Sequence, residues 1–545
     1  MSYLKTHLFF KRILVLLTAF VLSSVLILSI SRSSTPVFTA ADTRTLPYDL
    51  VYVPEAIREL EANITMEKGI LGWEPGWSQT SDFMIGTVAV SVILPSCNGQ
   101  IDPCSQGGWS SSEVNLVLSE VQNALNWWEA RATDAGTSVD FHIVTGSPLI
   151  VPTNYEPIDR PGGGASLCGE EGLWIDNVMA NLGYNDYPPG GNSYLLEVRE
   201  YDNELRNQNN TDWAFTIFVA DSSNNPGGMF DLTDCGGQTN PFAVAAWAYL
   251  AGPFFVMNTI NNGYGSIFMD GVAAHELGHI FGAPDEVASS ICQQNQAPTC
   301  NTKFGYLGGE NQNCNPCLFS GCNNPCALDV PLSMMRFPED FLTGQIQNVI
   351  HVYTEQQIGW QDSDNDGLPD PIDTSPNLTL VSPPSPTTNN SPLYTGSTQD
   401  IPFPSTLPFP EPWRPAYPDE TINKIAGVEF RVNNSQWLLA SPSDGAFNSG
   451  MENFFFSPLF CTAGTYTVQV RAVNSVGNYS SITTHMIIVQ PSETCNYSYL
   501  PIIYSSNLSL LESPTTLLSD SYPGPSESVV PTPTAQSPSG GYPSP

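Results

Sequence analysis

Residues 274–286 read AHELGHIFGAPDE, a stretch that combines a helical pattern with several metal-binding side chains. His275 and His279 are four residues apart, which places them on one face of an α-helix with Cβ atoms about 5–6 Å apart. Two imidazoles in this arrangement can hold one zinc ion at about 2.0–2.1 Å each. Glu276 directly follows the first histidine, so its carboxylate can hold a water molecule beside the ion without being a ligand. The chain has only six histidines, and the two at this spacing predict a zinc site.

The residues after the second histidine predict a third ligand. Gly282 can adopt the left-handed backbone conformation that ends a helix, and Pro284 opposes any continuation of the helix. The resulting turn would bring Asp285 back toward the ion as an oxygen ligand, with the neighbouring Glu286 as the alternative. Three protein ligands leave a fourth position for water, which a catalytic zinc ion requires.

The spacing His275-Glu276-x-x-His279-x-x-Gly282-x-x-Asp285 resembles the extended motif of the metzincin metalloproteases, in the variant with aspartate as the third ligand. The resemblance implies an α+β zincin-type catalytic domain, in which a twisted mixed sheet supports the active-site helix. It also implies a zinc-dependent endopeptidase that hydrolyses peptide bonds of extracellular proteins through a zinc-activated water. Glu276 would then be the catalytic base that takes the proton from this water.

Metzincins also have a methionine turn beneath the metal. The segment 333–337 (SMMRF) resembles this turn, with Met335 in the better position and Met334 as the alternative. Two features depart from the pattern of the clan. Some members carry a tyrosine two residues after the methionine, where this chain has Phe337, and residues 292–326 are a cysteine-rich insertion between the helix and the turn. The first departure means that another group, or the zinc alone, stabilises the oxyanion.

The sequence before the zinc motif predicts the sheet that supports it. Residues 86–97 (GTVAVSVILPSC) are rich in β-branched side chains, and residues 213–220 (WAFTIFVA) form the continuous apolar run expected of a strand covered on both faces. Apolar residues at helical spacing predict an amphipathic helix over 112–131. We expect further extended segments at 139–143 and 247–257. A peptide substrate would lie extended along the last of these by strand addition.

A second metal-binding pattern occupies residues 361–374. Carboxylates stand at loop positions 1, 3, 5, 9 and 12, and a glycine at position 6 permits the sharp turn of a calcium loop. These carboxylates are Asp362, Asp364, Asp366, Asp370 and Asp373. Position 12 is an aspartate rather than the longer glutamate, and Pro369 and Pro371 oppose a following helix. The pattern therefore resembles the thrombospondin type 3 calcium repeat more than an EF-hand, and a solvated acidic linker is the alternative.

Composition divides the rest of the chain into further regions. We place the catalytic domain at residues 83–360 and an N-terminal extension or pro-segment at 42–82. Residues 375–420 are rich in Pro, Ser and Thr, which predicts a stiff, extended linker. Alternating strand patterns over 421–495 predict a small all-β sandwich, and the stretch GTYTVQVRAVNSVGN within it resembles immunoglobulin-like or fibronectin-like modules. A Ser/Pro-rich tail occupies 496–545.

The N-terminus carries a targeting pattern. Basic residues precede an apolar run over 13–30, and small residues follow near 39–41, as in a secretory signal peptide. The run is also long enough to span a bilayer. Residues 1–41 are therefore either a cleaved signal peptide or an uncleaved N-terminal anchor, and both alternatives place the rest of the chain outside the cytoplasm, secreted or membrane-anchored.

The chain has 12 cysteines, an even number that fits an oxidising compartment. Sequence proximity and elimination favour three disulfides: Cys97–Cys104, Cys461–Cys495 and Cys168–Cys235. Six more cysteines lie between residues 292 and 326, where disulfides are favoured over a structural zinc site because the chain is expected to be secreted.

The chain has a formal net charge of −36, from 17 Lys and Arg against 53 Asp and Glu. An acidic surface repels phosphate backbones, which argues against nucleic acid as a partner. Protein or peptide substrates are the expected partners, and the N-terminal anchor or the C-terminal module would hold the chain at a cell surface. The rival interpretation is a non-enzymatic calcium-binding adhesin or scaffold with a structural or degenerate zinc site. The intact Glu276 opposes it, because a degenerate site has little reason to retain a glutamate that is not a ligand.

Overall fold

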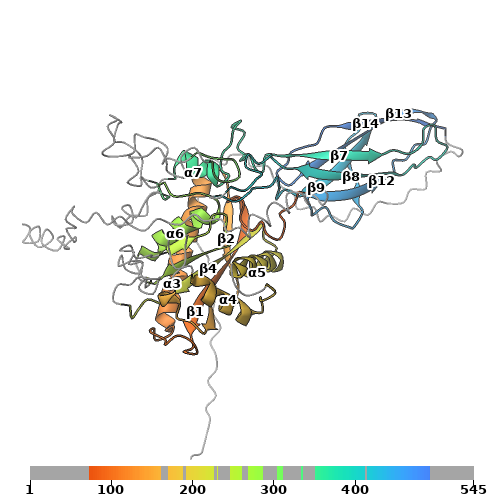
Figure 1. Ribbon diagram of the computed structural model, residues 1–545. Coiled ribbons are helices and arrows are strands. Elements are labelled where there is room, and N and C mark those ends of the chain that lie inside the picture. Colours follow the sequence, from red (N-terminus) through yellow and green to blue (C-terminus); the bar gives the residue numbers. More distant parts are fainter. Residues whose placement is uncertain are drawn as a thin grey trace, which may run out of the picture. The chain divides into compact units, whose positions relative to one another are not determined.

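The computed structural model describes residues 73–160, 170–187, 192–225, 230, 246–259, 268–286, 303–310, 333–335, 350–411 and 414–490. All of them belong to one unit, residues 1–494. This unit contains a mixed α/β part and, after it in the chain, two antiparallel sheets (Figure 1). The coarse expectation of an α/β part followed by a separate all-β part is therefore confirmed.

A six-stranded mixed sheet forms the centre of the described α/β part. Its strands are β1 (Gly86–Cys97), β2 (Val139–Ile143), β3 (Leu149–Thr153), β4 (Trp213–Ala220), β5 (Ala246–Ala248) and β6 (Phe254–Asn258). Across the sheet the order is β2-β1-β4-β6-β5, and β3 pairs with the second half of β1. These strands pair in parallel except β5, which is antiparallel to β6. Among the described strands, the sheet thus ends in one short antiparallel strand.

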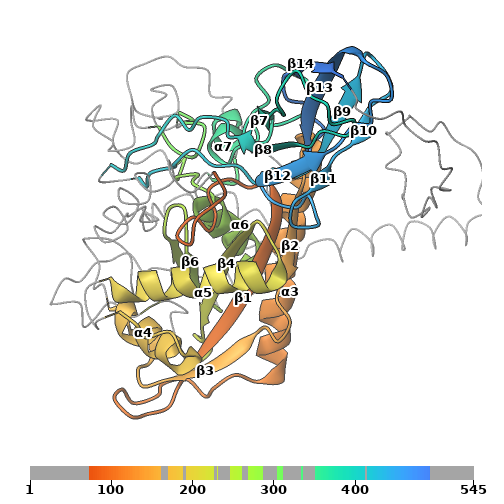
Figure 2. The same cartoon turned by 90° about the vertical axis from the view of Figure 1, so that its right-hand side faces the viewer.

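Helices cover both faces of this sheet (Figure 2). They are α3 (Ser111–Asp134) and α6 (Met269–Ile280) on one face, and α4 (Glu171–Leu182) and α5 (Ser193–Asn209) on the other. The described residues also include a short helix, α7 (Val352–Gln357), and a 3₁₀ turn, η1 (Pro157–Asp159). Successive side chains of β1 enter two different cores: Val88 and Val90 join α3 and α6, whereas Ala89 and Ile93 join α4 and α5. Because both faces are buried, the central strands are almost continuously apolar.

The strongest sequence patterns of the α/β part are confirmed. β1 and β4 span the residues expected for them, and the expected amphipathic helix is α3. Ser110 begins α3 with a capping box, in which its hydroxyl accepts a hydrogen bond from Glu113 N and its own N–H donates to the Glu113 carboxylate. The segment expected at 247–257 is instead two strands, β5 and β6. Ala251 and Gly252 between them both have positive φ, so the chain reverses direction there.

Residues 73–85 also belong to the packed α/β part, although residues 42–82 were expected to be an N-terminal extension or pro-segment. Two buried arginines of α5 hold this segment through its backbone. Arg199 donates a hydrogen bond to the carbonyl of Ser78, and Arg206 donates one to the carbonyl of Gln79 at 2.9 Å. A removable pro-segment would therefore have to end before this range begins.

The second part is a β-sandwich of two four-stranded antiparallel sheets, with orders β10-β9-β13-β14 and β11-β12-β8-β7. The strands are β7 (Ser375–Val381), β8 (Tyr394–Ile401), β9 (Ile425–Val432), β10 (Leu438–Leu439), β11 (Ser441–Pro442), β12 (Met451–Phe456), β13 (Gly464–Asn474) and β14 (Thr483–Val489). Side chains from both sheets share one core. Phe456 stacks there between Tyr394 and Phe430, with ring centroids 4.8 and 4.2 Å apart.

Residues 375–420 differ from the stiff linker expected for them. Strands β7 and β8 lie in this range and pair from Ser375–Ile401 to Val381–Thr395. Leu378 and Leu380 alternate with polar residues and pack against the sandwich core, which is the period of a half-buried strand. The high proline content between and after the two strands concealed this short pattern. The sandwich therefore begins at β7 rather than at residue 421.

The described residues contain no helix that is long and apolar enough to cross a membrane. The targeting segment 1–41 and the tail 496–545 lie outside the described residues, as do Cys168, Cys235 and the cysteines of 292–326. The Cys97–Cys104 disulfide is confirmed. Cys461 is disulfide-bonded, and its expected partner Cys495 lies outside the described residues.

Candidate metal centre

Helix α6 carries the histidine motif through the core of the α/β part, and nearly all of its residues are buried. Trp128 of α3 donates its indole N–H to the carbonyl of Ala274 at 2.8 Å, which fixes the helix directly before the first histidine. His275 and His279 are 3% and 1% exposed. Their ring centroids are 4.9 Å apart, so the two imidazoles lie side by side on one face of the helix.

Backbone carbonyls fix the orientation of both imidazoles. His275 Nδ1 lies 2.8 Å from Met334 O, and His279 Nδ1 lies 2.7 Å from Ala283 O. Because a carbonyl oxygen can only accept a hydrogen bond, each Nδ1 carries the proton. In the neutral imidazole Nε2 then has the lone pair, which is the form in which a histidine binds a metal ion.

Asp285 reaches the two Nε2 atoms from the turn after α6. Gly282 in this turn has φ +87°, a conformation that glycine adopts without steric cost. The turn places Asp285 Oδ1 3.1 Å from His275 Nε2 and 3.5 Å from His279 Nε2. The three side chains offer two nitrogens and one oxygen that all lie within 4.8 Å of one another. We refer to His275, His279 and Asp285 as the donor set.

Glu286, the alternative third ligand, is turned away from the donor set. Its N–H donates to the carbonyl of Met335 at 2.7 Å, and its carboxylate accepts a hydrogen bond from the Thr354 hydroxyl at 2.9 Å. His351 Nδ1 lies 3.9 Å from the same carboxylate. The side chain is 1% exposed and ties the turn to α7, so the geometry favours Asp285 as the ligand.

Two further residues singled out by the sequence lie in or against the ligand helix. Glu276 is 2% exposed and follows His275 on α6. Met335 packs beneath the helix, because a Cβ atom on Gly278 would overlap Met335 Sδ and lie 2.9 Å from Met335 Cε. Both methionines of the predicted turn thus contact the motif, Met335 through its side chain and Met334 through its carbonyl.

The structure brings together three of the five carboxylates predicted for the second metal site. Asp362, Asp364 and Asp366 offer carboxylate oxygens within 4.8 Å of one another. The backbone N–H groups of Asn365 and Gly367 donate to the two carboxylate oxygens of Asp362 at 2.8 and 2.9 Å. The hydrogen bond from Gly367, and with it that from Asn365, lowers the pKa of Asp362. We call residues 362–367 the acidic loop.

The last two predicted calcium ligands make other contacts. Asp370 is buried, and its carboxylate accepts hydrogen bonds from the N–H of Ser363 at 2.8 Å and from its hydroxyl at 2.6 Å. Asp373 accepts one from the side-chain amide of Asn478 at 2.8 Å. Asp370 therefore binds the acidic loop through Ser363, Asp373 binds the sandwich through Asn478, and three of the five predicted carboxylates converge.

A third group of potential ligands, Cys97, Cys104 and Glu156, lies where β1 ends. The two cysteines form a disulfide, so they offer no thiolate to a metal ion. Glu156 accepts hydrogen bonds from the N–H groups of Ser105 and Gln106 at 2.9 and 3.3 Å. This group therefore has a structural role.

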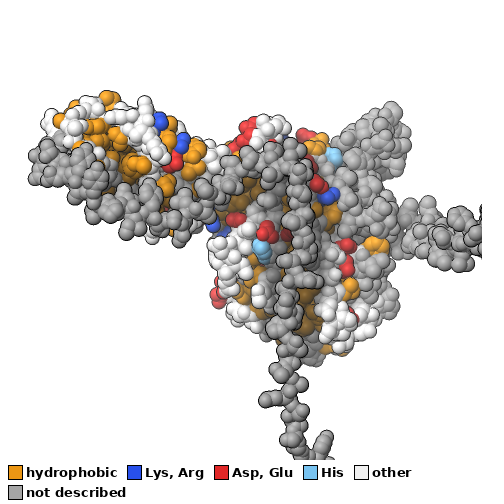
Figure 3. Space-filling model, turned by 180° about the vertical axis from the view of Figure 1, so that it is seen from behind, with side chains coloured by type: hydrophobic (Ala, Val, Ile, Leu, Met, Phe, Trp, Pro, Cys, Tyr) orange, Lys and Arg blue, Asp and Glu red, His pale blue; other side chains and the backbone are white. Residues whose placement is uncertain are grey.

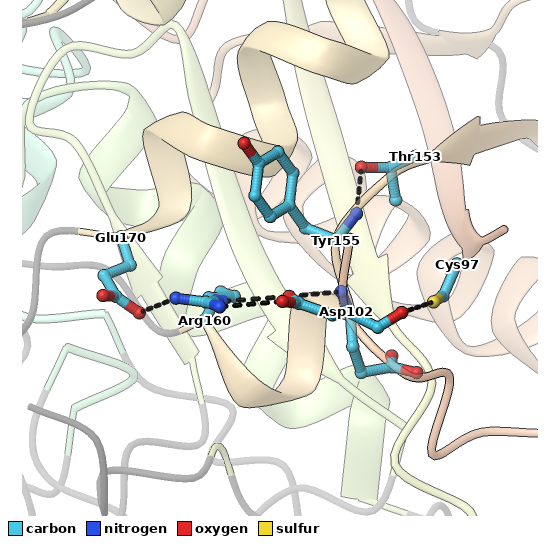
Figure 4. Close-up of polar contacts among 7 residues, drawn as sticks. Cys97, Asp102, Thr153, Tyr155, Arg160 and Glu170 are labelled. Atoms are coloured by element: carbon cyan, nitrogen blue, oxygen red, sulfur yellow. Dashed lines mark hydrogen bonds and ion pairs between the residues drawn. The ribbon is translucent and has the colours of Figure 1, made fainter. Parts of the chain in front are cut away.

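Arg160 joins the carboxylates of Asp102 and Glu170 near the end of β1 (Figure 4). Its guanidinium donates two hydrogen bonds to Asp102, at 3.0 and 2.8 Å, and one to Glu170 at 2.9 Å. The hydrogen bonds from Arg160 lower the pKa of Asp102. The network joins the loop after β1 to the residue that precedes α4, and it lies apart from the residues of the donor set.

Sequence reasoning missed the groups that orient the ligands. The Ala283 carbonyl had a local signal, because Ala283 lies four residues after His279 in the predicted turn. The Trp128 indole and the Met334 carbonyl had none that connects them to α6, since each is remote from the motif in sequence. Only the fold brings them against Ala274 and His275.

No protein-family model and no curated protein matches this sequence. Solved structures with some similarity include the sulfane dehydrogenase SoxCD from Paracoccus pantotrophus, with 14% identity, a TM-score of 0.14 and coverage of 19% of this chain and 23% of that one. The SrpA adhesin from Streptococcus sanguinis has 13% identity and a TM-score of 0.14, covering 21% of this chain and 57% of that one.

The PKD domain of a peptidase from a Thermoplasmatales archaeon has 19% identity and a TM-score of 0.13, covering 22% of this chain and 95% of that one. The chain spans about a quarter of the dehydrogenase and just over half of the adhesin. Scores this low carry no argument about fold or function, so the functional case depends on the geometry of the donor set.

Proposed function

We propose that the chain is a secreted zinc-dependent endopeptidase of the metzincin type, with its ion held by His275, His279 and Asp285. The observation that carries this proposal is the donor set itself: two buried imidazole nitrogens and one partly buried carboxylate oxygen within 4.8 Å of one another. Such a mixed set suits zinc and leaves a fourth position for water. Calcium and magnesium instead favour sites built from oxygen ligands alone.

Glu276 is the proposed general base and acid. A bound zinc ion would polarise the scissile carbonyl and lower the pKa of the attacking water. Glu276 accepts a proton from this water and delivers it to the leaving amine. Its burial next to His275 supports this role, because bulk water competes little for a carboxylate in such a place.

A peptide substrate would bind in extended form along β5. This strand is the last in the described sheet order and is antiparallel to β6. The turn between β5 and β6 is tied to the ligand helix, since Ala251 N–H donates to the carbonyl of His279 at 3.0 Å. A strand added at β5 would therefore pass near the donor set, and main-chain hydrogen bonds would hold it.

The acidic loop is a proposed calcium site. Asp362, Asp364 and Asp366 present only oxygen ligands, which is the set that calcium favours. The loop lies between α7 and β7 in the chain. Bound calcium would stiffen this connection between the α/β part and the sandwich.

The proposed partners are extracellular proteins or peptides rather than nucleic acid. The net charge is −36, and among the described residues on the face drawn in Figure 3, lysine and arginine side chains form only small, separate patches. Such a surface gives little attraction to phosphate backbones. The Cys97–Cys104 disulfide supports an oxidising compartment, as expected of a secreted chain.

A digestion assay with the purified full-length chain tests the proposal. We expect stoichiometric zinc and cleavage of casein that a zinc-selective chelator abolishes and added zinc restores. A calcium-selective chelator serves as the matched control and should leave most of the cleavage. Stoichiometric zinc without cleavage of any peptide in a diverse substrate library would contradict the proposal and favour a non-enzymatic scaffold.

A further inference from the structure

The connection between strands β8 and β9 of the sandwich, residues 402–424, packs into the α/β part. Leu407 and Tyr417 are members of the hydrophobic core that also contains α3 and α6, and they are 7% and 0% exposed. Phe403 and Ile422 pack against the same core. A segment of the sandwich thus supplies side chains to the core around the ligand helix.

Tyr306 anchors this connection to the α/β part. Its hydroxyl lies 2.6 Å from the carbonyl of Phe403 and accepts a hydrogen bond from Glu420 N at 3.1 Å. Its carbonyl accepts hydrogen bonds from Thr406 N at 3.4 Å and from the Ser405 hydroxyl at 3.3 Å. Because these contacts hold both ends of the connection, the α/β part fixes the position of the residues between them.

The hydroxyl of Tyr417 lies against the turn that carries the third ligand. A Cβ atom on Gly282 would overlap the Tyr417 hydroxyl, and it would lie 3.2 Å from Tyr417 Cζ and 3.1 Å from Gly305 Cα. Gly282 is therefore enclosed between Tyr417 and Gly305. Together with its φ of +87°, this enclosure restricts the backbone conformation of the turn.

This turn positions one member of the donor set and the carbonyl that orients another. Ala283, the residue after Gly282, supplies the carbonyl that lies 2.7 Å from His279 Nδ1. Asp285 follows two residues later, with Oδ1 3.1 Å from His275 Nε2. A shift of the turn by a fraction of an ångström would move both the carbonyl that orients one imidazole and the carboxylate that completes the set.

We propose that Tyr417 is a positioning residue of the metal centre, so that the sandwich completes the site of the peptidase. This inference rests on the proposed zinc-binding function of the donor set. It assigns the C-terminal module a part in metal binding, through one tyrosine whose hydroxyl lies against Gly282 in the turn. Groups that orient metal ligands typically change metal affinity by about 10–100-fold when they are removed.

Three variants of the full-length chain test the proposal: Tyr417→Ala, Tyr417→Phe and, as the matched control, Phe409→Ala. Phe409 lies in the same connection and is 69% exposed. Zinc affinity is measured by competition with a chromophoric chelator, and ligand geometry by the visible absorption of the cobalt(II)-loaded protein. Circular dichroism checks that each variant is folded.

We expect Tyr417→Ala to weaken zinc binding about 10–100-fold and to change the cobalt spectrum. Tyr417→Phe keeps the ring against the turn and should recover most of the affinity, while Phe409→Ala should match the parent chain. A folded Tyr417→Ala variant with the parent affinity and spectrum would overturn the proposal. If that variant does not fold, Tyr417→Leu takes its place, and an unchanged affinity and spectrum in it would overturn the proposal equally.

These readouts do not depend on catalysis, so the two proposals can fail separately. A chain that cleaves no peptide, but whose cobalt spectrum changes in Tyr417→Ala, supports the positioning role and contradicts the peptidase. A chain that cleaves peptides, with zinc affinity and spectrum unaltered in Tyr417→Ala, supports the peptidase and overturns the positioning role.

Discussion

The donor set and the acidic loop are built in different ways. The two histidines of the donor set are buried, and remote parts of the chain orient them: Met334 holds His275, and the turn held by Tyr417 supplies the carbonyl for His279. The acidic loop is exposed, and hydrogen bonds from its own backbone orient Asp362. The geometry of the donor set therefore depends on contacts from across the fold, whereas that of the acidic loop depends mainly on its own few residues.

The largest expected effect is the loss of one imidazole ligand. We predict that His279→Ala loses stoichiometric zinc and all measurable peptide cleavage, an effect larger than the about 10–100-fold typical of removing an orienting partner. Metal analysis by mass spectrometry and a casein digestion assay measure it. His142→Ala is the control, because His142 is an exposed residue of β2 that pairs with Asp140. Parent-like zinc content in His279→Ala would contradict the assignment of His279 as a zinc ligand.

The next effect separates the two candidate carboxylates. We predict that Asp285→Asn weakens zinc binding by about 10-fold or more, because the amide oxygen that replaces a carboxylate ligand is neutral. Glu286→Gln should keep zinc affinity within about 3-fold and lower the free energy of unfolding by about 1 kcal/mol, through its contact with Thr354. The reverse ranking in a chelator competition assay would make Glu286 the ligand.

A steric change beneath the helix should have a smaller effect. Gly278→Ala places a Cβ atom onto Met335 Sδ, so we predict a loss of about 1–3 kcal/mol in the free energy of unfolding, measured by urea denaturation. The control is Gly107→Ala, where a Cβ atom would meet its nearest neighbour, Asn224 Nδ2, at 3.8 Å. The double variant Gly278→Ala/Met335→Ala should lose less stability than the sum of the two single variants, because the overlap is then absent. No destabilisation in the single variant would show that Met335 does not pack there.

The smallest effect is expected in the acidic loop. We predict that Asp362→Asn reduces the upward shift in Tm that calcium produces, and leaves zinc content and casein cleavage unchanged. Calcium at 100 times its Kd would add about 2.7 kcal/mol to the stability of the parent chain. Differential scanning calorimetry with and without calcium measures the change. A loss of zinc in Asp362→Asn would show that the donor set and the acidic loop are coupled, and would contradict their independence.

The same comparison explains how much could be predicted from the sequence. His275 and His279 follow from the period of one helix, and the convergence of Asp362, Asp364 and Asp366 follows from a local turn. The choice between Asp285 and Glu286 required the backbone of the turn and the hydroxyl of Thr354, which is remote in sequence. Adjacent carboxylates cannot be ranked without these contacts.

The elements of the fold also divide into those set by a local pattern and those set by long-range contacts. β1 and β4 were predictable because both of their faces are buried, which gives long apolar runs. β7 and β8 are hard to predict because proline-rich segments lie between and after them, and only their pairing shows that they belong to the sandwich. The contact of Tyr417 with Gly282 joins residues more than a hundred positions apart, and no sequence pattern marks such a contact.

The measurement that tests the central claim most directly is a paired determination of zinc content and peptide cleavage in the parent chain and in Glu276→Ala. This variant removes the proposed base and none of the ligands. The account predicts equal zinc stoichiometry in the two proteins and loss of cleavage in the variant. Cleavage at the parent rate by Glu276→Ala, or a parent chain that binds no zinc, would contradict it.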